Sequence, residues 1–251
     1  MTDVPDVKEL PVLILAGGMG TRLRSVYKSG PKCMAPIAGR PFLEYLLRAL
    51  LDQGVSRVLI SVGYMKEAII HHFGRGAALN MQLEYVAEET PLGTAGAIKN
   101  AEARMQDPYF VVLNGDSFLE VRLAELLRQH IEKQAFVTVA TVRVHDRNRY
   151  GEIQMDQQGR ILGFCEKNAS NTSQTPHTAA MFAVNGGVYA MNREFLHLIE
   201  SAKNVSLERD IFPRLTAGNC YGFSVDGYFI DIGIPQDLQR AQTELPERIR
   251  L

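Results

Sequence analysis

The first half of the chain alternates short apolar runs with amphipathic stretches. The apolar runs predict strands at 11–16, 57–62, 83–86 and 109–113. Helical periodicity between them predicts helices at 42–53, 67–73 and 94–105. Such alternation of strand and helix indicates a parallel sheet covered on both faces. We therefore expect an α/β fold, doubly wound, with a Rossmann-like N-terminal half.

After residue 132 the pattern changes to strands with few helices between them. Strands are predicted at 136–144, 151–155, 161–165, 180–190 and 228–232. Helices are predicted at 196–200, at 207–215 and from Pro235 to about residue 243, and a polar loop at 168–179. This half should extend a mostly parallel, mixed sheet. We expect a single domain over residues 1–245, with halves at about 10–132 and about 133–245.

A glycine-rich loop follows the first predicted strand, at Gly17, Gly18 and Gly20. Glycines let the backbone approach a ligand closely, and successive N–H groups in such a loop bind anions. Arg22 adds a planar cation suited to phosphate oxygens. The loop matches neither a P-loop nor a dinucleotide fingerprint, because Leu23 stands where the third glycine would be. It predicts a phosphate site at the carboxyl end of this strand.

Three charged residues elsewhere in the chain extend this site. Lys32 follows a proline that stiffens its loop, and its amine can return to the same phosphates. Asp116, in the sequence NGDS, comes just after the strand at 109–113, where a Mg²⁺ ligand is expected near phosphates. Asp231 stands between apolar residues in FIDIG, and a charge there needs a partner or a metal. Together, Asp116 and Asp231 predict a two-carboxylate Mg²⁺ site.

Composition narrows the class of protein. The 251 residues include 27 Lys plus Arg and 28 Asp plus Glu, a net charge of −1. No overall positive field is therefore available to hold nucleic acid or an anionic membrane. The 3 cysteines are far apart and form neither a disulfide framework nor a zinc pattern. No apolar run reaches the roughly 18 residues of a membrane helix, and the acidic N-terminus is no signal peptide. We expect a cytoplasmic protein that binds small anions.

A series of short motifs runs along nearly the whole chain. They are LAGGMGTRL (15–23), PKCMAPIAGRP (31–41), TPLGTAGAI (90–98), NGDS (114–117), YGEI (150–153), FCEK (164–167), NGGVYAM (185–191), SLERDIFP (206–213) and GYFIDIGIPQD (227–237). In content and order they resemble the sugar-nucleotide pyrophosphorylases, nucleotidyltransferases that join an NTP to a sugar 1-phosphate. The resemblance implies a nucleotide-diphospho-sugar transferase type of fold without the C-terminal β-helix that some relatives carry.

The resemblance also implies a role for each matching residue. Arg22, Lys32 and Asp116 are implied to be catalytic, with Mg²⁺ held by Asp116 and Asp231. The first half is implied to bind the nucleotide, through Leu15, Ala16, Gly17, Gly18, Gly20, Thr21, Glu88, Gly93, Thr94, Asn114 and Gly115. The second half is implied to bind the sugar phosphate, through Gly151, Glu166, Lys167, Asn185 and Gly186. Two plainer readings remain: Glu166 and Lys167 as an exposed strand edge, and Gly186 with its neighbour as a packing bulge.

The identity of the base depends on Glu88. This residue falls where the family reads the edge of the base. A carboxylate only accepts hydrogen bonds. Guanine offers two adjacent donors, N1–H and N2–H₂, whereas uracil and thymine offer one N–H flanked by two carbonyls. Glu88 therefore favours GTP, unless it is only a solvated loop charge.

The sugar is suggested by resemblance alone. The stretch RSVYKSGPKCMAPIAGRPFLEYLL and the sequence DIGIPQD, with Ile234 where many relatives have Thr, look most like the D-glycero-α-D-manno-heptose 1-phosphate guanylyltransferases. These make GDP-heptose for capsule, S-layer or related bacterial surface polysaccharides. Mannose 1-phosphate is the nearest alternative, because the two sugars differ by one hydroxymethyl group, worth about 1–3 kcal/mol of discrimination.

Other functions stay open at this stage. Glucose 1-phosphate thymidylyl or uridylyl transfer is one, and a molybdopterin-type guanylyltransferase, which also begins with LAGG, is another. A regulatory subunit that binds sugar nucleotides without catalysis is a third, although Arg22, Lys32, Asp116 and Asp231 are all present. The expected partners are GTP and a sugar 1-phosphate, with no nucleic acid and no membrane. A homo-oligomer is compatible with the sequence.

Overall fold

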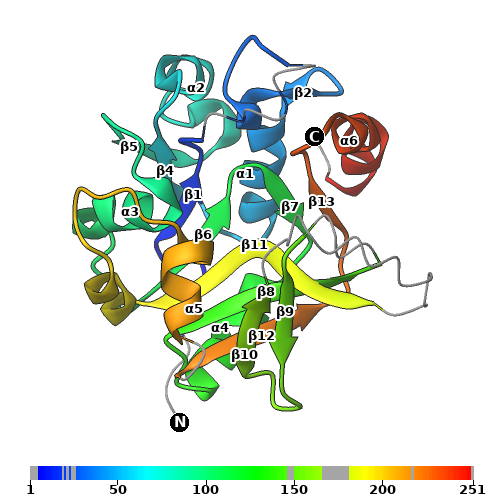
Figure 1. The fold of residues 1–251 in the computed structure, drawn as a ribbon. Coiled ribbons are helices and arrows are strands. Elements are labelled where there is room, and N and C mark those ends of the chain that lie inside the picture. The colour runs from blue at the N-terminus through cyan, green and yellow to red at the C-terminus, as the bar shows by residue number, and fades with distance from the viewer. Residues whose placement is uncertain are drawn as a thin grey trace.

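A computed structural model describes residues 5–18, 20, 23, 27–145, 150–165, 181–215 and 218–249. Its core is one mixed sheet with the strand order β10-β9-β11-β6-β1-β4-β5, in which β8 pairs with β11 and β12 (Figure 1). The strands are β1 (Val12–Leu15), β4 (Arg57–Val62), β5 (Gln82–Ala87), β6 (Tyr109–Asn114), β8 (Val137–Val144), β9 (Glu152–Met155), β10 (Ile161–Cys165), β11 (Phe182–Asn192) and β12 (Cys220–Val225).

The four strands of the first half, β6, β1, β4 and β5, lie parallel in that order. The second half adds β11 antiparallel to β6, β8 antiparallel to β11, and β12 parallel to β8. Two small antiparallel pairs stand apart from this sheet: β2 (Pro36–Ile37) with β3 (Arg40–Pro41), and β7 (Ser117–Leu119) with β13 (Phe229–Asp231). The expected class, a doubly wound mixed α/β sheet, is confirmed.

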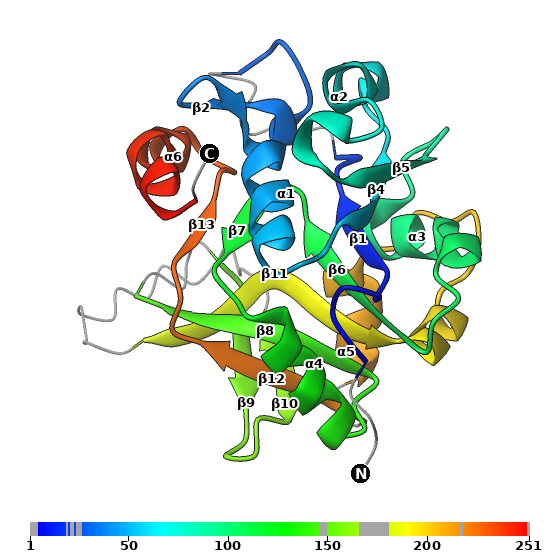
Figure 2. The same cartoon turned by 180° about the vertical axis from the view of Figure 1, so that it is seen from behind.

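Helices cover both faces of the sheet, as Figures 1 and 2 show from opposite sides. They are α1 (Phe42–Asp52), α2 (Lys66–Phe73), α3 (Gly93–Asn100), α4 (Leu123–Glu132), α5 (Phe212–Leu215) and α6 (Pro235–Arg248), with 3₁₀ turns at Lys32–Met34, Ala77–Leu79, Glu102–Arg104 and Arg193–Leu198 and a π turn at Leu207–Ile211. None of the helices in the described ranges combines the length and apolar character needed to cross a membrane.

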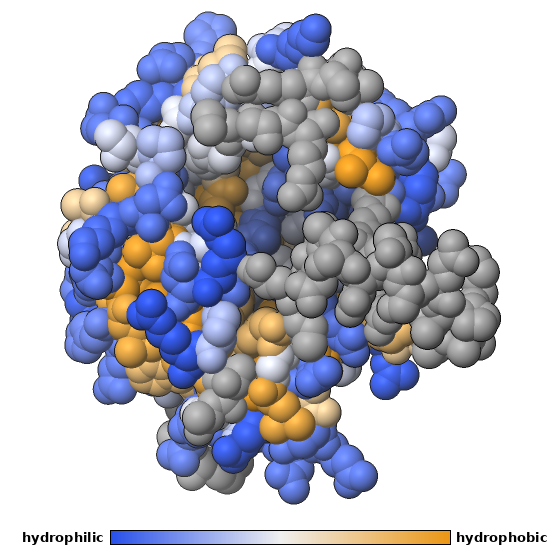
Figure 3. All heavy atoms as spheres, viewed as in Figure 1, coloured by the Kyte–Doolittle hydropathy of each residue, from blue (hydrophilic) through white to orange (hydrophobic). Residues whose placement is uncertain are grey.

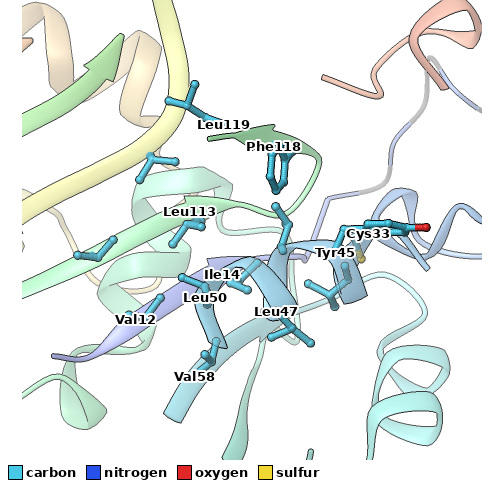
Figure 4. Close-up of a cluster of buried hydrophobic side chains, with 14 of the residues drawn as sticks. Val12, Ile14, Cys33, Tyr45, Leu47, Leu50, Val58, Leu113, Phe118 and Leu119 are labelled. Atoms are coloured by element: carbon cyan, nitrogen blue, oxygen red, sulfur yellow. The ribbon is translucent and has the colours of Figure 1, made fainter. Parts of the chain in front are cut away.

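Successive side chains of β1 point to opposite faces of the sheet and pack into two separate hydrophobic cores. Val12 and Ile14 face the layer of α1, α2, α4 and α6, whereas Leu13 faces the layer of α3 and α5. Figure 4 shows the first of these cores, with Val12 and Ile14 beside Leu47 and Leu50 of α1. Because β1 is buried on both faces, its sequence is continuously apolar rather than alternating.

Some elements differ from the sequence expectation. Helix α4 was not predicted, although Leu123, Leu126, Leu127 and Ile131 bury one helical face. Strand β12 was not predicted either, because Gly222 interrupts its β-propensity; there the side chain of Met155 fills the space that a Cβ would take. The final helix runs to Arg248 instead of ending near residue 243, with a proline inside it.

Two predicted helices take other forms. The helix expected at 94–105 ends at Asn100 and continues as a 3₁₀ turn, and the one expected at 196–200 is the 3₁₀ turn Arg193–Leu198. The stretch expected at 207–215 begins with the π turn Leu207–Ile211, whose first residues are hydrogen-bonded to Thr94 of α3.

Candidate active site

A cavity of about 710 Å³ opens at the carboxyl ends of β1, β4 and β6. In the space-filling view of Figure 3 the molecule is hollowed near the middle of this face. The chain reaches β4 and β5 on one side of β1 and then returns to β6 on the other side, so the cavity lies at the point where the strand order reverses. Ligands of open α/β sheets bind at such points. The cavity lies where the sequence predicts a phosphate site, and its role as that site stays a prediction.

Three strand ends form the floor of this cavity. Leu15 of β1 pairs with Asn114 of β6 on one side and with Ser61 of β4 on the other. Gly17, Gly18 and Gly20 also line the cavity, and the Gly17 carbonyl accepts a hydrogen bond from the Tyr64 N–H at 3.3 Å. Close packing of backbone on backbone explains the small residues here: a Cβ on Gly63 would lie 3.0 Å from the Gly17 carbonyl oxygen.

Lys32 lies between two carboxylates that are far apart in the sequence, Asp116 and Asp231. Its Nζ donates to Asp116 Oδ2 at 2.8 Å and to Asp231 Oδ1 at 3.1 Å. The Lys32 side chain is only 12% exposed. Burial alone lowers the pKa of this amine, but the charges of Asp116 and Asp231 and the hydrogen bonds to them outweigh burial and raise the pKa above its usual value. The amine is therefore a fixed positive charge and not a base.

Backbone contacts keep the two carboxylates together. Asp231 of β13 pairs with Ser117 of β7, immediately after Asp116. The Ile232 N–H donates to the Asp116 carbonyl at 3.1 Å, and the Gly233 N–H donates to Asp231 Oδ1 at 2.7 Å. Strand β13, the last strand in the described ranges, is thus bound to β7 and to Asp116 after β6, and this pairing places the second carboxylate beside Lys32.

This pair of carboxylates fits a magnesium ion better than a metal held by protein alone. Among the described residues no group of three or more His, Cys, Asp or Glu side chains is placed to hold a metal. Mg²⁺ commonly takes one or two carboxylates and completes its shell with water and substrate phosphates. Asp116 and Asp231 provide such oxygen ligands, and their side chains are 45% and 34% exposed, so a phosphate-bound ion can reach them.

Glu88, just after β5, also lines the cavity and is held by hydrogen bonds. Its Oε1 accepts from the Ser61 hydroxyl at 2.9 Å, and its Oε2 accepts from the Leu92 N–H at 3.1 Å. The position that a Cβ on Gly17 would take falls on Glu88 Oε1. The carboxylate is therefore held against Gly17 and lines the cavity.

The remaining wall joins α3 to the π turn Leu207–Ile211. Thr94 Oγ1 donates to Glu208 Oε2 at 3.0 Å and accepts from the Leu207 N–H at 2.8 Å. Ser206 Oγ also donates to Glu208 Oε2, at 2.9 Å. These bonds hold the N-terminus of α3 and the π turn as one unit, so that Glu208 and the exposed Arg209 line the cavity.

Most of the predicted nucleotide residues come together here. The cavity is lined by Leu15, Ala16, Gly17, Gly18, Gly20, Lys32, Glu88, Gly93, Thr94, Asn114, Gly115 and Asp116. Asp231 joins them through Lys32. Thr21, Arg22, Glu166 and Lys167 lie outside the described residues.

Three predicted sugar-phosphate residues, Gly151, Asn185 and Gly186, do not line this cavity among the described residues. Asn185 Nδ2 donates to the Tyr189 hydroxyl at 2.8 Å, and its Oδ1 accepts from the Gly187 N–H at 2.9 Å. A Cβ on Gly186 would lie 2.6 Å from a methyl carbon of Leu119. The packing interpretation therefore accounts for Gly186 without a ligand, and the sugar roles of these residues stay predictions.

Sequence reasoning missed several residues that line the cavity, namely Cys33, Gly63, Tyr64, Glu89, Thr90, Pro91, Ala97, Asn204, Glu208 and Arg209. The motif SLERDIFP contains two of them, but nothing in its letters shows that it folds back onto α3. Cys33 is not a nucleophile here, because burial raises the pKa of its thiol to about 12.

Asn114 presents an unsatisfied acceptor beside the cavity. Its Nδ2 donates to the buried Tyr189 hydroxyl at 3.4 Å, while its buried Oδ1 has no hydrogen-bond partner in the described part of the chain. Buried polar atoms are nearly always paired in folded proteins. A ligand donor that reached this oxygen would complete the network.

Comparison with known proteins identifies the class of enzyme. The chain belongs to the nucleotidyl transferase family, whose model matches residues 11–248. The D-glycero-alpha-D-manno-heptose 1-phosphate guanylyltransferase of Aneurinibacillus thermoaerophilus is 36% identical over 96% of this chain and 100% of that protein. The mannose-1-phosphate guanylyltransferase of Mycobacterium tuberculosis is 37% identical over 94% of this chain, which spans 65% of that longer protein.

Solved structures agree with this assignment. HddC from Yersinia pseudotuberculosis, crystallised in complex with GMP-PN, superposes with a TM-score of 0.80 at 34% identity, over 93% of this chain and 98% of that one. A putative glucose-1-phosphate thymidylyltransferase from Bacillus anthracis shares the fold, with a TM-score of 0.77 at 21% identity over 93% and 94% of the two chains.

Proposed function

We propose that the protein transfers the guanylyl group of GTP to a sugar 1-phosphate and releases pyrophosphate. The observation that carries this proposal is that one cavity is lined both by Lys32, which lies between Asp116 and Asp231, and by a Glu88 fixed by hydrogen bonds. The first group provides charges suited to phosphates, and the second provides an acceptor suited to a base. A nucleoside triphosphate whose phosphates lie toward Lys32 fits this division.

The chemistry asked of the side chains is positioning and charge neutralisation. An oxygen of the sugar phosphate attacks the α-phosphorus of GTP, the bond from that phosphorus to the bridging oxygen of the β-phosphate breaks, and pyrophosphate leaves with the electron pair. A phosphate monoester is already an anionic nucleophile at neutral pH, so no general base is needed. Lys32 stabilises the charge that moves onto the leaving pyrophosphate.

Magnesium is part of the proposal, with Asp116 and Asp231 as its protein ligands. When bound, the ion neutralises phosphate charge and orients the triphosphate. The lysine that now bridges the two carboxylates keeps them close together without the ion. Arg22 is assigned the same task of charge neutralisation on the nucleotide, and Lys167 on the sugar phosphate, as the family resemblance implies.

Guanine is favoured as the base. Glu88 offers only acceptors, and guanine is the base that presents two adjacent donors to a carboxylate. The names of the two guanylyltransferase relatives and the GMP-PN ligand of the Yersinia structure support this choice. Thymidylyl or uridylyl transfer is the alternative, and it would have to place a carbonyl-flanked N–H against a carboxylate.

Among sugars we propose D-glycero-α-D-manno-heptose 1-phosphate first and mannose 1-phosphate second. Relatives with both names match at similar identity, 36% and 37%. The sequence around Lys32 and the DIGIPQD motif favour the heptose. With this substrate the enzyme belongs to bacterial surface polysaccharide synthesis, such as capsule formation, and works in the cytoplasm.

Pyrophosphate release tests the proposal directly. GTP, CTP, UTP, dTTP and ATP are each combined with heptose, mannose and glucose 1-phosphates, with Mg²⁺ and with EDTA. The expected result is Mg²⁺-dependent release with GTP and heptose 1-phosphate. Release with GTP and mannose 1-phosphate keeps the mechanism and replaces the sugar and pathway. A folded protein that is silent in every combination overturns the proposal in favour of a regulatory subunit.

A further inference from the structure

Ser61 is a buried polar residue that the reaction described above does not use. It is the last residue but one of β4, where it pairs with Leu15, and it is fully buried. Its hydroxyl donates to Glu88 Oε1 at 2.9 Å. A buried hydroxyl must find a partner, and here the partner is the carboxylate proposed to read the base.

Glu88 is held from several directions at once. Its N–H donates to the Val62 carbonyl at 2.8 Å, which continues the pairing of β4 with β5. The Leu92 N–H holds Oε2 at 3.1 Å, and the missing Cβ of Gly17 leaves the space for Oε1. Ser61 and Gly17 therefore act on the same oxygen, one by binding it and the other by making room for it.

The Glu88 carboxylate has more acceptor sites than the two hydrogen bonds that hold it, so it can also bind a ligand. A carboxylate has about four lone-pair sites, and hydrogen bonds from the described residues occupy two of them, one on each oxygen. Counted over those residues, one site on each oxygen remains for a ligand. Two parallel donors on a base edge can bind both carboxylate oxygens only if the carboxylate has one orientation. A freely rotating glutamate loses rotamer entropy when a ligand fixes it, whereas a side chain already held in place does not pay this cost on binding.

We propose that Ser61 is a positioning residue for base selection: through its hydrogen bond to Glu88 Oε1 it orients the carboxylate toward the two donors of guanine. This inference rests on the proposed function, in which Glu88 reads the base. It adds that selectivity depends on the orientation of Glu88 as well as on its charge. A purely structural Ser61 would change stability and leave the choice of base unaltered.

Four variants separate these possibilities: Ser61→Ala, Ser61→Thr, Glu88→Gln, and the double variant Ser61→Ala with Glu88→Gln. Thr138→Val is the matched control, because it also removes a fully buried hydroxyl that binds a titratable side chain, in this case His130 at 2.9 Å. For each variant, kcat and KM are measured with GTP, ITP, UTP and dTTP, and Tm is recorded. ITP keeps N1–H and lacks the 2-amino group, so it reports on the second donor.

We expect Ser61→Ala to raise KM for GTP roughly tenfold while kcat at saturating GTP stays within about threefold. The preference for GTP over ITP and over UTP should shrink by a similar factor. Ser61→Thr keeps the hydroxyl and should keep the preference, and Thr138→Val should lower Tm alone. In the double variant the loss should equal that of Glu88→Gln and not the sum, because Ser61 acts through Glu88.

The remaining outcomes distinguish the inference from the function it rests on. If Glu88→Gln loses base preference and Ser61→Ala does not, Glu88 reads the base and the inference about Ser61 is wrong. Additive losses in the double variant would also overturn it. If neither variant changes the preference of an enzyme active with GTP, the base is read elsewhere. If the wild type shows no activity with GTP, the proposed function itself has failed.

Discussion

Lys32 and Asp116 are 84 residues apart in the sequence, yet Lys32 Nζ lies 2.8 Å from Asp116 Oδ2. The same amine also binds Asp231, so three charges share one small volume at the edge of the cavity. A change at any of them alters the field that the other two experience. The three residues should therefore be tested as a cluster.

Asp116→Asn should abolish Mg²⁺-dependent turnover while the fold survives. The amide keeps the shape of the side chain and loses the charge that the proposed Mg²⁺ site requires, and a loss of about 100-fold or more in kcat is expected. Circular dichroism checks the fold, and Asp107→Asn, at an exposed position, is the matched control. Turnover above about a tenth of wild type would remove Asp116 from the metal site.

Lys32→Met should lower kcat by about 100-fold, because the leaving pyrophosphate loses a fixed positive charge. Lys32→Arg should not restore the rate, since a planar guanidinium cannot take the position of a compact ammonium between two carboxylates. Without the lysine the two carboxylates attract a divalent ion more strongly, so Lys32→Met should bind Mg²⁺ or Mn²⁺ more tightly than wild type in calorimetry without nucleotide. Weaker metal binding in this variant would contradict a shared carboxylate site.

The pH dependence of activity gives a separate check on Lys32. The raised pKa of its amine means that the proton stays bound up to and beyond pH 10.5. The stabilisation that the Lys32 ion pairs provide is complete below that pH and is lost only above it. We expect no fall in kcat attributable to Lys32 in a pH profile from 7 to about 10. A Lys32-dependent fall near neutral pH would show that the amine titrates there.

Gly233→Ala should reduce activity with little cost to stability. A Cβ at this position would lie 2.9 Å from Asp231 Oδ1 and 3.2 Å from Lys32 Nζ, so both groups must move. These are ends of flexible side chains, and their displacement costs the fold little while it disturbs the charge cluster. Gly163→Ala, where the nearest atom lies 3.7 Å from the new Cβ, is the control. Equal kcat values for the two variants would contradict this role.

Buried His130 should make the fold sensitive to acid. Burial lowers the pKa of its ring from 6.5 to about 4, and its Nε2 has no hydrogen-bond partner within the described ranges. Between these two values the unfolded chain takes up a proton and the folded chain does not, so stability falls as the pH drops from 6.5 to about 4. The loss attributable to this ring is on the order of 3 kcal/mol.

His130→Leu should flatten this part of the pH dependence. Urea unfolding of wild type and variant between pH 7.5 and 4 measures the difference, and His71→Leu, at an exposed position, serves as the control. Parallel curves for wild type and His130→Leu would mean that another group causes the acid loss.

The elements with clear apolar periodicity and the edge of the sheet that carries the candidate site could be predicted from the sequence. Contacts that depend on tertiary pairing could not. Strand β1 and helix α1 were predicted because their apolar periods are long and unambiguous. The glycine loop, Lys32 and the strand-end Asp116 could be placed at one edge because parallel strands end together. Asp116 and Asp231 could be named from the sequence as candidate metal ligands. Their common contact with the Lys32 amine could not be predicted, because it depends on the tertiary pairing of β7 with β13.

Contacts between side chains that are distant in the chain could not be predicted from the sequence. No local pattern marks Ser61 as the partner of Glu88, since the two lie on neighbouring strands 27 residues apart. Glu208 belongs to a motif that was recognised, yet its place on the cavity wall depends on hydrogen bonds to Thr94, 114 residues away. Strand β12 was not predicted because Gly222 lowers its β-propensity. A side chain at this position would collide with Met155, which is distant in sequence and close only in the folded structure.

The pairing of Lys32 with Asp231 also sets the order in which the site is assembled during synthesis. The two residues are 199 positions apart, and β13 is the last strand that the structure describes. A nascent chain that has already folded β1, β4, β5 and β6 holds the glycine loop, Lys32 and Asp116 but lacks the second carboxylate. Since residue 231 must leave the ribosome before the cluster can close, a shorter nascent chain holds Lys32 and Asp116 without the second carboxylate, and the three charges cannot come together before that point.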